Sequence, residues 1–203
     1  MSLRKAYLLI FIILLIDQVS KIYVKTNFTL DRPGNEAYVF EWFRIHFIEN
    51  EGMAWGTKIP GEYGKLILTV FRIFAVFGIG YWLADAIKKR HSTYLIVAIA
   101  LIFAGAAGNI IDSVFYGVIF DDSSHNLATL FSPTPYGSWF HGLVVDMFYF
   151  PIWEGNLPTW LPIFGGKHFA FFNAIFNVAD MAISTGVGIL LVFNKRAFPK
   201  THN

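Results

Sequence analysis

Two acidic residues occur in sequence contexts that a membrane would not normally accept. Asp146 lies in the stretch HGLVVDMF, and Asp180 lies near the start of the apolar run 178–193. A charge at the centre of a bilayer costs about 2.5–3.5 kcal/mol on insertion scales, so an ionisable residue there is a candidate functional group. Two carboxyl groups that share a site would hold one proton between them. The ionised group could then activate water while the protonated group donates to a carbonyl oxygen, which would hydrolyse a peptide without a metal.

Other polar residues have spacings that would bring them to the same place. Asn109 and Asp112 are three residues apart, as are Asn177 and Asp180, so each pair would share a helix face. The small residues of AGAAG before Asn109 would let a neighbouring helix approach closely. These four residues and Asp146 could therefore meet in one pocket. Such a cluster could catalyse hydrolysis, join helices or conduct ions or protons, and spacing alone leaves all three open.

The composition indicates a membrane protein and excludes several chemistries. The chain is 55% hydrophobic and only 15% charged, with a mean hydropathy of +0.51, whereas soluble domains are usually about 45–50% apolar and about 25% charged. It has no cysteine, which excludes a thiol nucleophile and thiolate metal ligands. HExxH and GxSxG motifs and a glycine-rich phosphate loop are also absent, which disfavours metal and serine peptidases. The formal net charge of +2 gives no indication of a nucleic-acid partner.

Four apolar stretches would position these residues as an all-α membrane protein of one domain, 1–203. Each has about the 20 residues needed to cross a bilayer. The first is too long for a signal-peptide core and lacks a cleavage site, so we interpret it as a retained helix. The stretches predicted as spans are 6–24, 66–84, 94–111 and 172–193, with outer loops at 25–65 and 113–171.

Charge asymmetry predicts the orientation. The segments predicted to be inside contain a single acid, Asp85, and many basic residues: Arg4, Lys5, Lys88, Lys89, Arg90, Lys195, Arg196 and Lys200. The positive-inside rule therefore places both termini and the loop 85–93 in the cytoplasm. This orientation puts both asparagine–aspartate pairs at the outer ends of their spans.

The two outer loops differ in pattern. Residues 37–50, AYVFEWFRIHFIEN, alternate in polarity and predict a strand of a small sheet at the bilayer interface. The second loop, 113–171, is rich in proline, glycine and aromatic residues, which predicts an irregular, amphipathic segment at the interface. Asn50, at the end of the predicted strand, would by itself be only a turn former. Asp17 and Lys21, four residues apart in the first span, predict a structural ion pair or an interface anchor.

Five motifs give the chain a resemblance to a known family. In chain order they are DQVSK, NEGMAWG, AGAAGNIID, VVDMF and FNVADMAIS. Each is weak alone, but five in order on four predicted spans are specific. The chain resembles bacterial lipoprotein signal peptidase (signal peptidase II), a family of aspartyl intramembrane proteases.

The resemblance implies a four-helix membrane core with a periplasmic β-cradle. It also implies removal of the signal peptide from diacylglyceryl-modified prolipoproteins, by cleavage N-terminal to the lipidated cysteine, without a cofactor or metal. The expected enzyme is a multi-pass monomer of the bacterial inner membrane whose site lies near the outer face, among membrane lipids. The resemblance gives the following roles: Asp146 and Asp180 as the catalytic dyad; Asn109, Asp112 and Asn177 as supporting residues; Asn50 and Gly52 as substrate contacts; and Asp17 as a structural or positioning group.

The chain departs from the family pattern at three places. The family usually has an arginine where this chain has Glu49, and another where Ser113 follows Asp112. The segment 113–145 is also longer than is usual and predicts an inserted outer subdomain. A small transporter with a proton relay and a non-catalytic assembly subunit remain the alternative functions. The peptidase is favoured because the acids cluster at the outer ends of the spans, whereas a relay should continue through the membrane.

Overall fold

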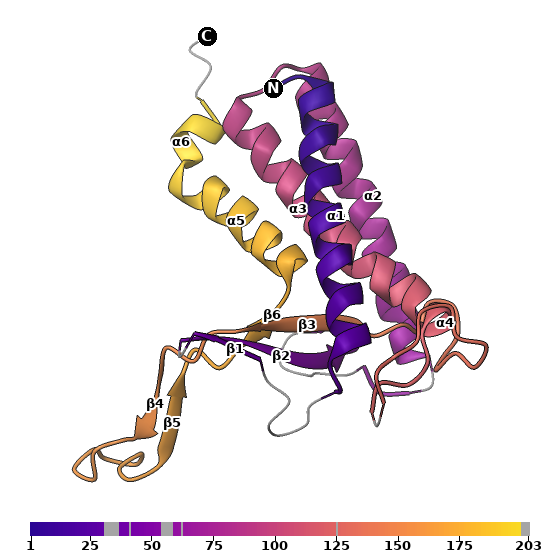
Figure 1. Cartoon of the computed structure of the whole chain (residues 1–203). Coiled ribbons are helices and arrows are strands. Elements are labelled where there is room, and N and C mark those ends of the chain that lie inside the picture. The colour runs from indigo at the N-terminus through magenta and orange to yellow at the C-terminus, as the bar shows by residue number, and fades with distance from the viewer. Residues whose placement is uncertain (31–36, 41, 54–58, 62, 125, 200–203) are drawn as a thin grey trace.

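A bundle of helices stands on a small β-sheet (Figure 1). The computed structural model describes residues 1–30, 37–40, 42–53, 59–61, 63–124 and 126–199. The bundle contains α1 (Leu3–Asn27), α2 (Gly64–Lys88), α3 (Thr93–Ile111) and α5 (Val178–Val192), and the short α6 (Asn194–Ala197) follows α5. The N-terminus and α6 lie at the end of the bundle away from the sheet (Figure 1). We call the opposite end the sheet end.

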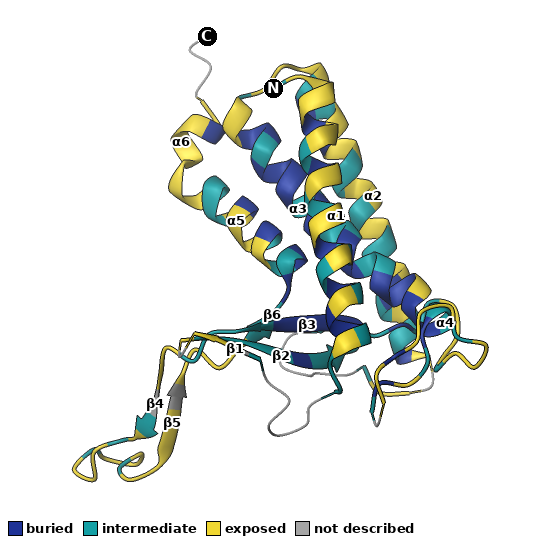
Figure 2. Ribbon diagram, in the orientation of Figure 1, coloured by how far each residue is buried: buried dark blue, intermediate teal, exposed yellow. Residues whose placement is uncertain are grey.

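Three helices of the described chain are long and apolar enough to cross a membrane: α1, α2 and the continuous helix Thr93–Ile119. The last of these is central, because α3 packs against α1, α2 and α5. Accordingly, 56% of its most apolar 18-residue stretch is buried, against 22% of the corresponding stretch in α1 and 11% in α2. The outer faces of α1 and α2 are exposed (Figure 2) and carry large apolar side chains such as Phe71, Phe74 and Phe77. Exposed apolar surfaces of this extent indicate contact with lipid.

The fourth predicted span is shorter than expected. The sequence predicted a span over 172–193, but α5 covers Val178–Val192, which is 15 residues. The residues before it are not helical, because Ile175–Phe176 form strand β6 and Asn177 caps the helix. The prediction was therefore wrong at its N-terminal end, since apolar character alone did not distinguish the strand from the helix.

The third helix, in contrast, is longer than predicted. The predicted loop 113–171 begins inside a helix, because α3 continues through a π-helical segment, η2 (Asp112–Tyr116), and a short turn, α4 (Gly117–Ile119). The backbone N–H groups of Phe140 and Gly142 donate to the carbonyls of Val114 and Ser113, respectively, at 3.1 and 2.9 Å. These contacts attach a distant segment of the chain to η2.

The sheet has four antiparallel strands in the order β1-β2-β3-β6. The single strand predicted over 37–50 is two strands, β1 (Ala37–Phe40) and β2 (Phe43–Asn50), and Glu41 lies outside the described residues. The loop predicted to be irregular contributes β3 (Val144–Tyr149) to the middle of this sheet, and contributes a separate ribbon of β4 (Trp153–Asn156) and β5 (His168–Phe171). This ribbon projects from one end of the sheet, away from the helices (Figure 1).

Glycines allow α3 and α5 to approach closely, as the AGAAG pattern predicted. A Cβ atom added at Gly105 would lie 2.2 Å from the backbone oxygen of Ala179, and one added at Gly108 would lie 2.6 Å from a carboxylate oxygen of Asp17. A larger residue at Gly105 would clash with the backbone of α5, and one at Gly108 would displace the Asp17 side chain of α1. This close packing brings the polar residues at the sheet ends of α1, α3 and α5 into contact.

Candidate active site

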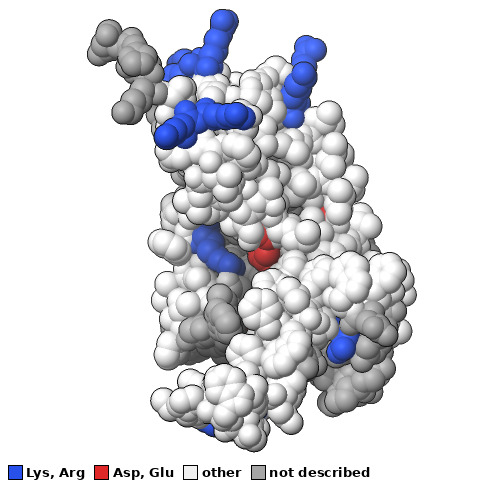
Figure 3. Space-filling view, turned by 90° about the vertical axis from the view of Figure 1, so that its left-hand side faces the viewer, with Lys and Arg blue, Asp and Glu red and all other residues white. Residues whose placement is uncertain are grey.

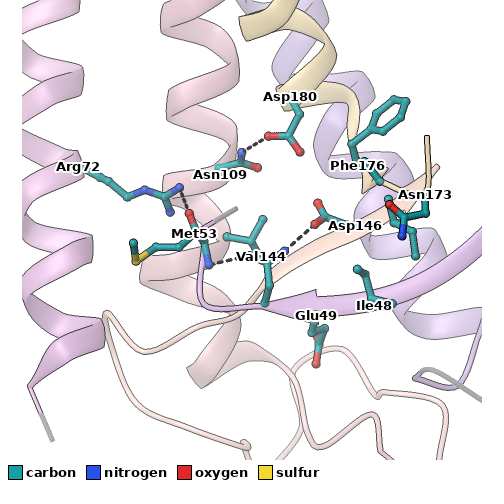
Figure 4. Close-up of a pocket in the computed structure, with 14 residues that line it drawn as sticks. Ile48, Glu49, Met53, Arg72, Asn109, Val144, Asp146, Asn173, Phe176 and Asp180 are labelled. Carbon is teal, nitrogen blue, oxygen red and sulfur yellow. Dashed lines mark hydrogen bonds between the residues drawn. The ribbon is translucent and has the colours of Figure 1, made fainter. Parts of the chain in front are cut away.

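A cavity of about 660 Å³ lies between the sheet and the sheet ends of α2, α3 and α5 (Figure 4). Its lining includes Asp146 and Asp180, which the sequence predicted to be a catalytic pair. The lining residues are Ile48, Glu49, Asn50, Gly52, Met53, Arg72, Asn109, Val144, Asp146, Asn173, Ala174, Ile175, Phe176 and Asp180.

Asp146 enters the cavity from the middle of the sheet. Its strand, β3, is paired on both sides, and Asp146 itself lies opposite Ile48 of β2. One carboxylate oxygen accepts a hydrogen bond from Nδ2 of Asn50 at 2.5 Å, and the other accepts from Nδ2 of Asn177 at 2.6 Å. The paired strands and these two amides fix the position of the carboxyl group, and Asp146 as a residue is only 6% exposed.

Asp180 enters from the first turn of α5. Asn177 and Asp180 form a capping box, because the Asn177 side chain accepts from the Asp180 backbone N–H at 2.9 Å and the Asp180 carboxylate accepts from the Asn177 backbone N–H at 3.3 Å. This reciprocal arrangement explains why the helix begins here. The spacing had predicted that Asn177 and Asp180 share a helix face. This was wrong, because Asn177 is the cap of the helix and lies outside it. Nδ2 of Asn109 donates to the other Asp180 oxygen at 2.9 Å.

Asn177 joins the two carboxyl groups into one site. Its side chain contacts Asp146 and its backbone contacts Asp180. The same Nδ2 group is within hydrogen-bonding distance of Asn109 Oδ1 and the Val145 carbonyl, both at 3.1 Å. We refer to Asp146 and Asp180 as the dyad. Asn109, Asn177 and the dyad meet as the sequence predicted.

Asp112, the fifth residue predicted for the pocket, lies behind it in a buried ion cluster. Lys21 Nζ is 2.9 Å from a carboxylate oxygen of Asp17 and 2.8 Å from one of Asp112, and all three side chains are at most 1% exposed. The ion pair predicted between Asp17 and Lys21 is therefore present. Lys21 also donates to Asn109 Oδ1 at 2.8 Å, so the cluster supports the amide that holds Asp180. We call Asp17, Lys21 and Asp112 the Lys21 cluster.

Burial changes the protonation of the dyad. Removal from water, and then the negative charge of Asp180, raise the pKa of Asp146 to about 8. Both effects disfavour the ionised carboxylate. At neutral pH Asp146 therefore carries a proton, which is the condition that carboxylate-pair chemistry requires.

Asn50 and Gly52, predicted as substrate contacts, form a turn at the edge of the cavity. Asn50 holds Asp146, as described above, and its Oδ1 accepts from the backbone N–H of Gly52 at 2.6 Å. Gly52 has a φ of +94°, a conformation that strongly favours glycine. Residues 54–56 of the NEGMAWG motif lie outside the described residues.

The structure shows what occupies the two positions where arginines were expected. Glu49 points to the side of β2 opposite Asp146 (Figure 4), where it forms a buried ion pair with Lys25 of α1. Lys25 also donates to Ser123 at 2.6 Å, and its ammonium lies 5.3 Å from the ring of Phe120. The long segment after Asp112 is thereby attached to α1 and β2. Ser113 is buried in η2 and donates to the Asn109 carbonyl at 3.0 Å.

The prediction from the sequence did not include one charged residue of the cavity lining, Arg72. Arg72 lies within α2, and its Nη2 donates to the carbonyl of Gly52. The criterion that identified the two aspartates, an ionisable residue within an apolar segment, also applies to Arg72, because it lies within the predicted span 66–84. Among the described residues, no group of three or more His, Asp or Glu side chains is arranged to hold a metal ion.

Apolar helices and a small sheet that bring two carboxyl groups to one cavity, one of them with a pKa raised to about 8, are typical of an intramembrane aspartyl protease. A family model described as "Signal peptidase (SPase) II" matches residues 9–195. The chain therefore belongs to the signal peptidase II family, an aspartic-type protease family, and this membership favours the peptidase over a small transporter.

Individual proteins that are similar in sequence to this chain are named as lipoprotein signal peptidases. A lipoprotein signal peptidase of Porphyromonas gingivalis is 49% identical over 95% of this chain and 82% of its own length. One of Amoebophilus asiaticus is 38% identical over 95% of this chain and 78% of its own. A solved structure of a bacterial membrane enzyme superposes with a TM-score of 0.63 at 23% identity, and covers 99% of this chain and 94% of that one. That likeness shows a membrane enzyme fold with a small β-sheet region.

Proposed function

We propose that this protein removes the signal peptide from diacylglyceryl-modified prolipoproteins by cleaving the bond N-terminal to the lipidated cysteine. Family membership supports the reaction class. The observation that carries the assignment of the site is the contact of both Asp146 and Asp180 with the same asparagine, Asn177, at one cavity. No metal or cofactor takes part in this proposal.

The proposed mechanism uses the dyad as one acid and one base. Asp180, as carboxylate, takes a proton from a water molecule whose oxygen attacks the scissile carbonyl carbon. Asp146 donates its proton to the carbonyl oxygen, which gives a neutral geminal diol. Asp180 then protonates the leaving nitrogen while Asp146 recovers a proton from one hydroxyl as the C–N bond breaks. Each carboxyl returns to its starting state, and one water is consumed.

The amide side chains keep this arrangement in place. Asn50 and Asn177 orient Asp146, and Asn109 orients Asp180. The Lys21 cluster lies behind them and holds Asn109, and Asp17 accepts from the backbone N–H of Ala179 in the first turn of α5 at 2.9 Å. We assign these residues a positioning role, because a rigid supporting shell is what keeps catalytic groups in productive geometry.

We further propose that α5 is the fourth span and that the sheet is a periplasmic cradle. Lysine and arginine side chains gather at the end of the bundle away from the sheet (Figure 3), which supports a cytoplasmic location for that end. The same view shows an acidic group in a hollow below the basic end. The scissile bond would then lie at the outer face of the inner membrane, and the substrate's lipid chains would lie in the bilayer. Both carboxyl groups come from one chain, so we propose that a monomer is active.

The test uses two forms of one precursor with the full-length protein in detergent or liposomes. Product formation is followed by gel mobility for a diacylglyceryl-modified precursor and for the same precursor without lipid. Cleavage of the modified form alone is expected. Cleavage of both forms would contradict the proposed substrate, and cleavage of neither would contradict the proposed function.

A further inference from the structure

Arg72 is a cation in the cavity that the mechanism above does not use. It lies in α2 among apolar residues, with Phe71 and Ile73 on either side, yet it lines the same cavity as Asp146 and Asp180. Charged residues in membrane helices are costly and are generally kept for a function. Within the described part of the chain, Arg72 forms no ion pair that would explain its presence as purely structural.

The two ends of the guanidinium group are used differently. Nη2 donates to the carbonyl of Gly52, whereas Nη1 is buried and has no hydrogen-bond partner among the described residues. Leaving a buried donor without a partner is costly, so native structures rarely keep one without reason. Figure 4 shows the guanidinium directed from α2 toward the cavity, on the side of the cavity opposite Phe176.

Gly52 fits the guanidinium closely. A Cβ atom at this position would lie 2.0 Å from Nη1 of Arg72, and the φ of +94° also disfavours any other residue. The Asn50–Gly52 turn is therefore shaped around Arg72. This contact fixes the direction of the guanidinium from the sheet side, as α2 fixes it from the helix side.

The nitrogen atoms of the neighbouring amides already have acceptors. Nδ2 of Asn50 donates to Asp146, and Nδ2 of Asn109 donates to Asp180. Asn177 behind them already has three acceptors around its Nδ2. In the described lining, Nη1 of Arg72 is the buried nitrogen that has no hydrogen-bond partner, while the dyad supplies acceptors.

We propose that Nη1 of Arg72 binds a carbonyl oxygen of the precursor and so places the scissile bond against the dyad. The inference rests on the proposed function, because it concerns the same substrate. Carbonyl oxygens occur both in the peptide next to the scissile bond and in the ester groups of the diacylglyceryl unit. Nη2 keeps its bond to Gly52 in this complex, so one guanidinium joins the turn to the substrate, which a lysine ammonium could not do in the same fork geometry.

The experiment measures kcat and KM for Arg72→Gln and Arg72→Lys with the diacylglyceryl-modified precursor. Both variants should raise KM by about 10- to 100-fold, which corresponds to the loss of one charged hydrogen bond, with a smaller change in kcat. Gly52→Ala should give a similar rise, and the double variant with Arg72→Gln should be no worse than either single one. Lys65→Gln is the matched control, because Lys65 also binds this turn, at the Glu51 carbonyl (2.7 Å), but does not line the cavity.

A second substrate separates the two sources of the carbonyl. With a dialkylglyceryl precursor, whose ether links have no ester carbonyl, the Arg72→Gln penalty disappears if the ester is the ligand and persists if the peptide is. Unchanged KM in Arg72→Gln, or a rise no larger than in Lys65→Gln, would overturn the inference. Because wild-type cleavage is measured in the same assay, failure of the proposed function would be seen separately as absence of cleavage by the wild type.

Discussion

The dyad and the Lys21 cluster both lie at the sheet end of the bundle, and both contain two aspartates. In the Lys21 cluster one cation lies within 2.9 Å of each carboxylate and offsets one of their two negative charges. In the dyad, Asp146 and Asp180 are held by neutral amides, and neither forms an ion pair within the described residues. The dyad borders the cavity, whereas the Lys21 cluster does not line it.

This difference separates structural charge from reactive charge. A buried carboxylate that contacts a cation is stabilised by the opposite charge. A buried carboxyl group beside another carboxylate, with only amides around it, retains a proton that it can donate. The same residue type thus serves two purposes, according to whether its neighbour is a cation or an acid.

The largest expected effect is the loss of catalysis on replacing either member of the dyad. Asp146→Asn and Asp180→Asn keep the size of the side chain but cannot exchange a proton, so cleavage of the lipidated precursor should fall by at least about 10²–10⁴-fold. The melting temperature, followed by intrinsic tryptophan fluorescence in detergent, should be unchanged or higher. Near wild-type cleavage by either variant would show that the residue is not catalytic.

The next effect is on stability. Lys21→Met leaves Asp17 and Asp112 buried without their cation, which should destabilise the protein by about 3–5 kcal/mol. Urea or thermal unfolding in detergent measures this. Lys89→Met is the matched control, since Lys89 pairs with Asp85 at 2.9 Å on the surface, and it should leave the unfolding transition unchanged. Equal transitions for the two variants would contradict a structural role for the Lys21 cluster.

Asp146 should make both cleavage and stability depend on pH. Burial and Asp180 raise the pKa of Asp146 to about 8, so cleavage should decrease by about tenfold per pH unit above that value. The folded state binds this proton more tightly than the unfolded chain, whose aspartates have a pKa of about 3.9. The free energy of unfolding should therefore decrease as pH rises between about 4 and 8. In Asp146→Asn this part of the decrease should be absent, and an unchanged pH dependence would count against the assignment.

The smallest effect on stability is expected at the buried ion pair between Lys25 and Glu49. Lys25→Met alone leaves Glu49 without its cation and should lower the melting temperature. The double variant Lys25→Met/Glu49→Leu should recover most of that loss, because apolar residues often replace a buried pair at little cost. Cleavage by the double variant should remain close to wild type, since Glu49 points away from Asp146. A folded but inactive double variant would show that this pair takes part in the chemistry.

The sequence predicted the dyad because charges are conspicuous in apolar segments. The same criterion should have selected Arg72, which was overlooked in a long apolar stretch. The i, i+3 spacing of Asn177 and Asp180 predicted contact, but the contact is a capping box and not a shared helix face. An asparagine followed three residues later by an acid is a known capping pattern, so this start of α5 was predictable.

Other features depend on distant contacts and could not be predicted locally. The helix continues past Asp112 as η2, whose carbonyls accept hydrogen bonds from the backbone N–H groups of Phe140 and Gly142. The run 37–50 forms two strands because β2 pairs with both β1 and β3, and β3 comes from a segment about a hundred residues away. Period-two alternation indicates strand but does not locate the turn between two strands.

The protonation of Asp146 at neutral pH is tested most directly by infrared spectroscopy. Difference spectra between wild type and Asp146→Asn in detergent would be recorded across a pH titration, and the carboxylic acid C=O band would be followed. A band that is present at neutral pH, lost with a midpoint near pH 8 and absent from the variant is predicted. Absence of this band from the wild type at neutral pH would contradict a dyad that shares one proton.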